Sequence, residues 1–107
     1  MAEEVLLVLS TWPDAESARA AAESLVNERL AACANLLPAV ESIYRWEGAV
    51  EKSAEILMLI KTTIGCYPEL ERRIQELHSY EVPEVLAFRA ADGLPAYLRW
   101  VEESCER

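Results

Sequence analysis

Two long strand-like segments joined by a tight turn constrain the fold of this chain more than any other feature. The first runs from about Asn35 to Trp46 and the second from about Val50 to Thr63. At roughly 3.3 Å per residue, each segment would span about 40 Å. A globule of 107 residues has a diameter of only about 34 Å, from a radius of gyration of roughly 13 Å. We therefore expect a hairpin that extends beyond its own core and offers unpaired backbone to another chain.

Five other elements are predicted around this hairpin. In chain order they are a strand at Val5–Thr11, a helix at Ala15–Leu30, a helix from about Pro68 to Leu77, a strand at Val85–Ala90 and a last helix that begins at Pro95. This order predicts the α+β class, as a ferredoxin-like βαββαβ sandwich with an extra C-terminal helix. The chain is long enough for one such domain, 1–107, and leaves no room for a second.

The central strands carry apolar residues on both faces. The runs Val5–Leu9 and Ile56–Ile60 do not alternate between apolar and polar residues, as strands with one wet face do. The helices of a ferredoxin-like fold lie on one face of the sheet, so the other apolar face is a second indication of oligomerisation. Pro38 cannot donate a ladder hydrogen bond and predicts a bend or bulge in the first long strand.

The net charge of −9 and the cysteine pattern exclude several classes of partner. An acidic surface repels phosphate backbones, so no nucleic acid partner is expected, whereas cations, basic proteins or plain solubility fit this charge. The first apolar run is too short to cross a bilayer and no signal-type segment precedes it, so no membrane insertion is expected. Cys33, Cys66 and Cys105 form neither a disulfide framework nor a CxxC pattern. We interpret them as reduced thiols of a cytoplasmic protein.

Catalytic motifs are absent from the sequence. It has no GxSxG, P-loop or HExxH pattern. Ferredoxin-like acylphosphatases need an anion cradle with an arginine near the first strand, and here the corresponding loop, Ser10–Asp14, carries a carboxylate instead. We therefore predict a protein that is not an enzyme.

His78 is the one histidine, and it lies at the end of the second predicted helix. Glu81 and Glu84 follow it closely and offer oxygen ligands, so the three residues form a candidate site for a divalent cation. One histidine does not make a tight transition-metal site by itself, although a symmetric assembly could add ligands from neighbouring chains. The alternative is a helix-end histidine that makes local hydrogen bonds.

Two further features have more than one interpretation each. Lys61 closes the second long strand and either anchors an anion, pairs with a carboxylate such as Glu84, or simply packs its stem at a strand end. Tyr44, Trp46 and Tyr80 either line a ligand groove or bury against a partner chain. The sequence alone leaves these alternatives open.

Five segments, taken in order, resemble one protein family. They are Leu30–Asn35 (LAACAN), Ser42–Gly48 (SIYRWEG), Leu59–Thr63 (LIKTT), His78–Glu84 (HSYEVPE) and Tyr97–Trp100 (YLRW). Together they resemble the CutA divalent-cation tolerance proteins (CutA1) over nearly the whole chain and at the expected spacing.

The resemblance implies a ferredoxin-like subunit in a tight homotrimer, similar in build to the nitrogen-regulatory PII proteins. It also implies a non-enzymatic role in tolerance of divalent cations, copper above all. No cofactor would be required, and Cu(II) or another divalent cation would bind weakly. The metal-binding residues would be His78, Glu81 and Glu84.

Trp46, Lys61 and Tyr80 match family positions near the clefts between subunits, where any ligand is expected. The alternative function is a PII-like signalling or protein-anchoring module that binds a small metabolite or a partner in those clefts. Some members proposed to bind copper have a cysteine where this chain has Ser10 and a histidine where it has Leu77. Copper favours both cysteine and histidine ligands. This chain has neither at these two positions, so the resemblance does not extend to these two copper ligands.

Overall fold

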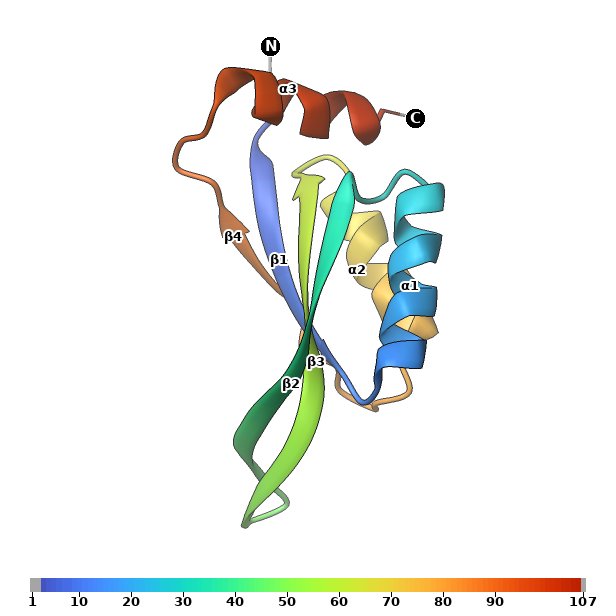
Figure 1. Ribbon diagram of the computed structural model, residues 1–107, viewed down its shortest axis with the longest axis vertical. Coiled ribbons are helices and arrows are strands. Elements are labelled where there is room, and N and C mark those ends of the chain that lie inside the picture. Colours follow the sequence, from blue (N-terminus) through green and yellow to red (C-terminus); the bar gives the residue numbers. More distant parts are fainter. Residues whose placement is uncertain (1–2, 107) are drawn as a thin grey trace.

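A computed structural model describes residues 3–106 of the chain. Its elements are β1 (Val5–Trp12), α1 (Ala15–Asn27), β2 (Cys33–Trp46), β3 (Ala49–Thr63), α2 (Tyr67–Leu77), β4 (Leu86–Arg89) and α3 (Pro95–Ser104). The strands form an antiparallel sheet in the order β2-β3-β1-β4. α1 and α2 lie on the same side of this sheet, and α3 crosses one end of it (Figure 1). The predicted ferredoxin-like α+β order with an extra C-terminal helix is confirmed. None of these described helices is long and apolar enough to cross a lipid bilayer.

α1 begins and ends with residues that satisfy its backbone locally. At its start, Oδ1 of Asp14 accepts a hydrogen bond from the backbone N–H of Ser17 at 2.7 Å, as an N-cap residue does. At its end, Arg29 adopts a left-handed φ of 60°. The N–H of Leu30 then donates to the carbonyl of Leu25 at 3.0 Å, the bond that defines a Schellman cap. The prediction that this helix continues to Leu30 was wrong, because Leu30 is buried by closing the cap rather than by extending the helix.

The main core lies between the sheet and the pair α1 and α2. Its buried side chains are Leu6, Val8 and Trp12 of β1, Ala18, Ala21, Ala22 and Leu25 of α1, Leu30 and Ala31 of the next loop, Ile56, Met58 and Ile60 of β3, and Leu70 and Ile74 of α2. The alanines of α1 let this helix lie close to the strands. Full burial of one large apolar side chain stabilises a fold by about 1.5–3 kcal/mol, so this core is able to hold one subunit together.

A smaller core lies under α3. Val101 and Cys105 pack there with Val5, Ala32 and Cys66, which fixes α3 to the start of β1 and to the loops beside it. The thiol of Cys66 donates to the carbonyl of Cys105 at 3.4 Å. Burial, together with the neighbouring Cys66, raises the pKa of the Cys105 thiol to about 11, so this group stays protonated at neutral pH.

β2 and β3 form the predicted overhanging hairpin. β1 pairs with β3 only from Ile56 to Thr63, so residues 49–55 of β3 pair with β2 alone and project beyond the rest of the sheet (Figure 1). The described part of the chain is accordingly elongated, at 47 × 26 × 22 Å. At the tip, Glu47 and Gly48 both have a positive φ, 48° and 83°, as a type I′ hairpin turn requires.

The predicted irregularity near Pro38 is present as a bulge. The register between β2 and β3 shifts between Leu37 and Val40. Ala39, inside this bulge, has a φ of 60°, a left-handed conformation that residues other than glycine seldom adopt. β2 therefore bends at this point without ending, and its second half runs with β3 to the tip.

Large apolar side chains are exposed on α1, on the hairpin, in the loops that follow β3 and α2, on β4 and at α3. They are Val26, Leu37, Ile43, Tyr44, Trp46, Val50, Ile64, Tyr80, Val82, Leu86, Phe88, Leu94, Tyr97 and Trp100. Leu86 and Phe88 alternate with Ala87, which packs on the main core, so these two belong to the face of the sheet that α1 and α2 leave uncovered. Exposed apolar surface, where it is contiguous, marks sites that bind another molecule.

Candidate functional site

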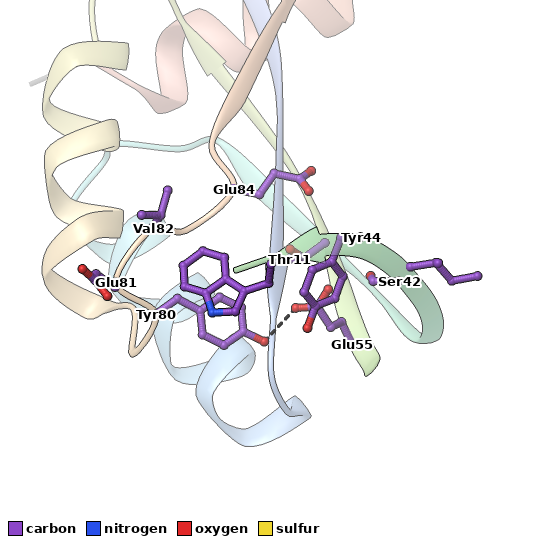
Figure 2. A pocket seen from close by; sticks show the side chains of 10 residues that line it. Thr11, Ser42, Tyr44, Glu55, Tyr80, Glu81, Val82 and Glu84 are labelled. Carbon is purple, nitrogen blue, oxygen red and sulfur yellow. Dashed lines mark hydrogen bonds between the residues drawn. The ribbon is translucent and has the colours of Figure 1, made fainter. Parts of the chain in front are cut away.

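A cavity of about 490 Å³ opens where β1 ends and the β2–β3 hairpin continues. Trp12 and Ile56 form the last cross-strand pair between β1 and β3, so Glu55 is the first β3 residue beyond the end of β1. Figure 2 shows the side chains that line the cavity. They are Thr11 of β1, Ser42, Ile43, Tyr44 and Trp46 of β2, Glu55 of β3, and Tyr80, Glu81, Val82 and Glu84 of the loop between α2 and β4.

Glu55 is the buried carboxylate of this cavity. Only 7% of the residue is exposed, although glutamates are almost never buried unless they are paired. Its Oε2 accepts a hydrogen bond from the hydroxyl of Tyr80 at 2.7 Å, drawn as a dashed line in Figure 2. Within residues 3–106 this is the one hydrogen bond that the carboxylate accepts. Because tyrosine is a neutral donor, this hydrogen bond brings no positive charge to Glu55.

Tyr80 connects Glu55 to the end of α2. Its hydroxyl donates to Glu55, and its backbone N–H donates to Nδ1 of His78 at 3.1 Å. Burial and, after it, the hydrogen bond to Glu55 raise the pKa of the Tyr80 hydroxyl well above its usual value. Tyr80 is therefore a protonated hydrogen-bond donor at physiological pH.

His78 is buried behind Tyr80, with 8% of the residue exposed. Its Nε2–H donates to the backbone carbonyl of Thr11 at 2.7 Å, and its ring stacks on Trp12 with the ring centroids 4.1 Å apart. A carbonyl only accepts and a backbone N–H only donates, so the imidazole here is neutral, with its proton on Nε2. The bond from Tyr80 is local, as the alternative for a helix-end histidine expects, whereas the bond to Thr11 joins residues 67 positions apart. A metal ion would have to displace one of these bonds to reach a ring nitrogen.

The cavity is acidic, but its carboxylates do not converge. Glu55, Glu81 and Glu84 line it, and no lysine, arginine or histidine is among the lining residues. Figure 2 shows these three side chains apart from one another. Across the part of the chain that the structure describes, no three His, Cys, Asp or Glu side chains are grouped so that they could hold a metal ion. The cavity therefore attracts cations through its net charge and not through a formed set of ligands.

The structure brings four of the six predicted site residues to this cavity: Trp46, Tyr80, Glu81 and Glu84. His78 supports the cavity from behind, through Tyr80 and Thr11. Lys61 lies elsewhere, on β3 away from the tip, where its Nζ donates to Oδ1 of Asn35. The interpretation that pairs Lys61 with Glu84 was therefore wrong, because Lys61 finds its partner on the neighbouring strand β2.

Sequence reasoning missed Glu55 and the carbonyl of Thr11. A signal for Glu55 was present, because it directly precedes the apolar run Ile56–Ile60 and so stands where β3 passes from the tip into the core. Its contact with Tyr80 joins residues 25 positions apart. No local pattern predicts such a contact.

Comparison with known proteins identifies relatives over almost the whole chain. A family profile described as "CutA1 divalent ion tolerance protein" matches residues 6–104. The "Divalent-cation tolerance protein CutA" of Thermus thermophilus is 48% identical over 102 residues, which cover 95% of this chain and 97% of that protein. The mouse "Protein CutA" is 43% identical over 96 residues, which cover 90% of this chain. The matched part is 54% of the mouse protein, so the chain spans about half the length of that relative.

A solved structure agrees with the fold as well. It is the divalent cation tolerance protein Cut A1 from Thermus thermophilus, and it superimposes with a TM-score of 0.93 at 46% sequence identity. The superposition covers 95% of this chain and 99% of that chain. The likeness therefore includes the overhanging hairpin as well as the helix-covered core.

Proposed function

We propose, from the premise that this chain belongs to the CutA1 family of divalent ion tolerance proteins, that it acts in the response to metal ions by weak binding of divalent cations. The observation that carries the proposal is the cavity at the end of β1, which three carboxylates line and no basic side chain does. A cleft with one sign of charge concentrates ions of the opposite sign. Binding is expected to be weak because no three ligands are grouped within residues 3–106.

Glu81 and Glu84 are the proposed contacts of the cation, since both line the cavity. Carboxylate oxygens suit Mg²⁺, Ca²⁺ and Mn²⁺, and an imidazole is needed to favour Cu²⁺. His78 is proposed as the third ligand only for a state in which its ring has released the carbonyl of Thr11 or the N–H of Tyr80. Cu(II) binding through His78 is therefore expected to lose part of its free energy to the hydrogen bond that must break.

The proposed working form is a homotrimer of the PII type. Support comes from the hairpin, whose tip pairs with no strand but its own partner, and from the exposed apolar side chains around it. Trp46, Lys61 and Tyr80 would then lie near clefts between subunits. Association of this kind adds to the apparent stability of each subunit.

The proposal includes no catalytic step and no required cofactor. The descriptions of the family and its relatives name tolerance of divalent cations and no reaction. The cytoplasm stays the predicted location, in keeping with three cysteines that are free thiols. Cell fractionation with an antibody to the chain tests this location.

Calorimetric titration with Mn(II) and Cu(II) tests the metal site. The parent protein, a Glu81→Gln/Glu84→Gln double variant and His78→Ala are compared, with Glu23→Gln on the exposed side of α1 as the matched control. We expect the double variant to bind Mn(II) at least about tenfold more weakly, a change of about 1.4 kcal/mol, and the control to match the parent. Equal affinity in the parent and the double variant would contradict the proposal that Glu81 and Glu84 contact the cation. Equal Cu(II) affinity in His78→Ala would remove His78.

A second candidate function is a signalling module that binds a small metabolite in the same cavity. Its volume of about 490 Å³ exceeds what a metal ion needs and falls in the range of small-molecule sites. A thermal-shift screen separates the two functions. Stabilisation by metals alone favours the first, and stabilisation by small molecules alone favours the second.

A further inference from the structure

We infer that the cavity is an aromatic cage for a small organic cation, an alkylammonium or guanidinium ion, with Glu55 as its counter-ion. The inference rests on the second candidate function, ligand binding in this cavity, and names the class of ligand. It does not require that metal ions bind there.

The buried carboxylate is the first argument. Glu55 is almost fully buried and accepts a hydrogen bond from Tyr80 alone among the described residues. Taking a carboxylate out of water costs several kcal/mol even after relaxation, and a charge of opposite sign is the partner that offsets this cost. No lysine, arginine or histidine lines the cavity. The described residues thus supply no positive charge to this cavity, and we assign that role to a bound cation.

The aromatic rings decide between a metal ion and an organic cation. Tyr44, Trp46 and Tyr80 all line the cavity, and Ser53 donates a hydrogen bond to the hydroxyl of Tyr44 at 3.3 Å, which orients that ring. The face of an aromatic ring attracts a weakly hydrated cation within about 6 Å of its centroid. A divalent metal ion needs oxygen ligands at about 2.0–2.6 Å, and no ring supplies them. Three aromatic side chains and one buried carboxylate in the same cavity are therefore typical of a site for an organic cation.

The size and the remaining walls fit the same class of ligand. The cavity of about 490 Å³ also contains the apolar side chains of Ile43 and Val82, which suit a hydrocarbon body attached to the charge. Glu81 and Glu84 come from the loop between α2 and β4, and Figure 2 places both away from the pair formed by Tyr80 and Glu55. They attract the cation to the cavity, whereas Glu55 and the rings hold it.

Choline and its neutral isostere 3,3-dimethylbutan-1-ol provide the test, because they share a shape and differ in charge. Both are titrated by calorimetry into the purified full-length protein in its native assembly state. We expect choline to bind with a dissociation constant of about 1 mM or tighter, and the isostere at least about tenfold more weakly, since the charge supplies most of the attraction. Equal binding of both compounds would show an apolar groove and would overturn the inference. The absence of choline binding at a choline concentration about fifty times the expected dissociation constant would overturn the inference as well. This holds whether the cavity repels choline or a neighbouring subunit covers the cavity.

Variants locate the bound cation. Glu55→Gln keeps the shape of the side chain and an acceptor for Tyr80 but removes the charge, so choline should bind at least about tenfold more weakly. Trp46→Leu, on the half-exposed tip, should weaken binding about threefold or more without disturbing the core. It serves as the test if Glu55→Gln does not fold. Glu23→Gln is the control and should bind choline as the parent does. Parent-like affinity in both Glu55→Gln and Trp46→Leu would contradict the proposed cage.

The same variants keep this inference separate from the metal-binding proposal. Choline binding that is lost in Glu55→Gln, while Mn(II) binding survives there, supports an organic cation held independently of metal. Mn(II) binding without any choline binding overturns the cage and leaves the metal proposal standing. Choline binding without Mn(II) binding overturns the metal proposal and leaves the cage standing.

Discussion

The helix-covered half of the sheet and the overhanging hairpin differ in how their apolar side chains are satisfied, although β3 runs through both. In the covered half, Trp12, Met58 and Ile60 are fully buried against α1 and α2. In the hairpin, Ile43 and Val50 are 60% and 62% exposed. The covered half is complete within one chain, whereas the hairpin leaves apolar surface and strand edges for another molecule to cover.

The cavity lies at the border between these two regions. Glu55 is the residue at which β3 leaves the covered half, and it is buried by Tyr80 from the loop after α2. A charge at this position faces the cavity, where the proposed cation would pair with it. The difference between the two regions thus accounts for both the proposed assembly and the proposed binding site.

The largest expected effect comes from removing a side chain of the covered half. Trp12→Ala deletes a fully buried ring that stacks on His78 and should cost about 3–5 kcal/mol of unfolding free energy. Trp46→Ala, at a residue 47% exposed on the hairpin, should cost about 1 kcal/mol or less in subunit stability. Guanidinium denaturation at one fixed protein concentration measures both. Similar losses from the two variants would erase the distinction between the regions.

A charge on the hairpin should weaken assembly and spare the subunit fold. Ile43→Glu places a carboxylate on exposed apolar surface, and we expect association to weaken at least about tenfold, or about 1.4 kcal/mol. Lys52→Ala alters the cross-strand neighbour of Ile43 without adding a charge to that surface and is the matched control. Sedimentation velocity over a dilution series measures association. An unchanged assembly in Ile43→Glu would show that the tip contacts no other subunit.

Alkaline pH should act at the border through Tyr80. Its pKa is raised from an ordinary value of 10.0, first by burial and then by the hydrogen bond to Glu55. The folded state therefore holds this proton more tightly than the unfolded chain. The resulting stability is complete below pH 10 and is lost as the pH rises from there through the raised value. Urea denaturation between pH 8 and pH 11, in the parent and in Tyr80→Phe, should show a steeper decline in the parent. Ionisation of Tyr80 near pH 10 in the folded protein, followed by tyrosinate absorbance, would contradict this.

The smallest expected effect concerns the bulge where the two halves of β2 meet. Ala39 has a φ of 60°, which costs an L-residue about 1–2 kcal/mol. Ala39→Gly should relieve this cost, partly offset by the greater freedom of glycine in the unfolded chain, for a net gain of up to about 1 kcal/mol. Ala54→Gly, at an exposed position of β3, lacks this strain and should lose about 0.5–1 kcal/mol. Thermal denaturation that ranks the two variants in the opposite order would refute the assignment of strain to the bulge.

The fold was predictable from the sequence because its main signals are local. The two long β segments, the Glu47–Gly48 turn between them and the proline in the first arm predicted the hairpin and its bulge. The end of α1 was not predictable from periodicity, because Leu30 keeps the apolar spacing after Arg29 has already turned the chain.

The candidate site was predictable only in part, because its contacts join distant segments. Tyr80 and Glu81 followed from the segment after α2, but their neighbour Glu55 comes from the middle of β3. For His78, a hydrogen-bonded helix-end residue was the alternative to a metal ligand, but its bond to a backbone carbonyl of β1 leaves no trace in side-chain patterns. Lys61 was grouped with the cavity although its partner Asn35 lies across the β2–β3 ladder.

The mass of the protein in solution tests the central claim most directly, namely that one chain does not satisfy its own hairpin. Light scattering coupled to size-exclusion chromatography, at micromolar concentration and neutral pH, measures this mass. We predict a single species at three times the 12.0 kDa mass of the chain. A stable, soluble species at 12.0 kDa, with a hairpin as well ordered as the core, would contradict the account.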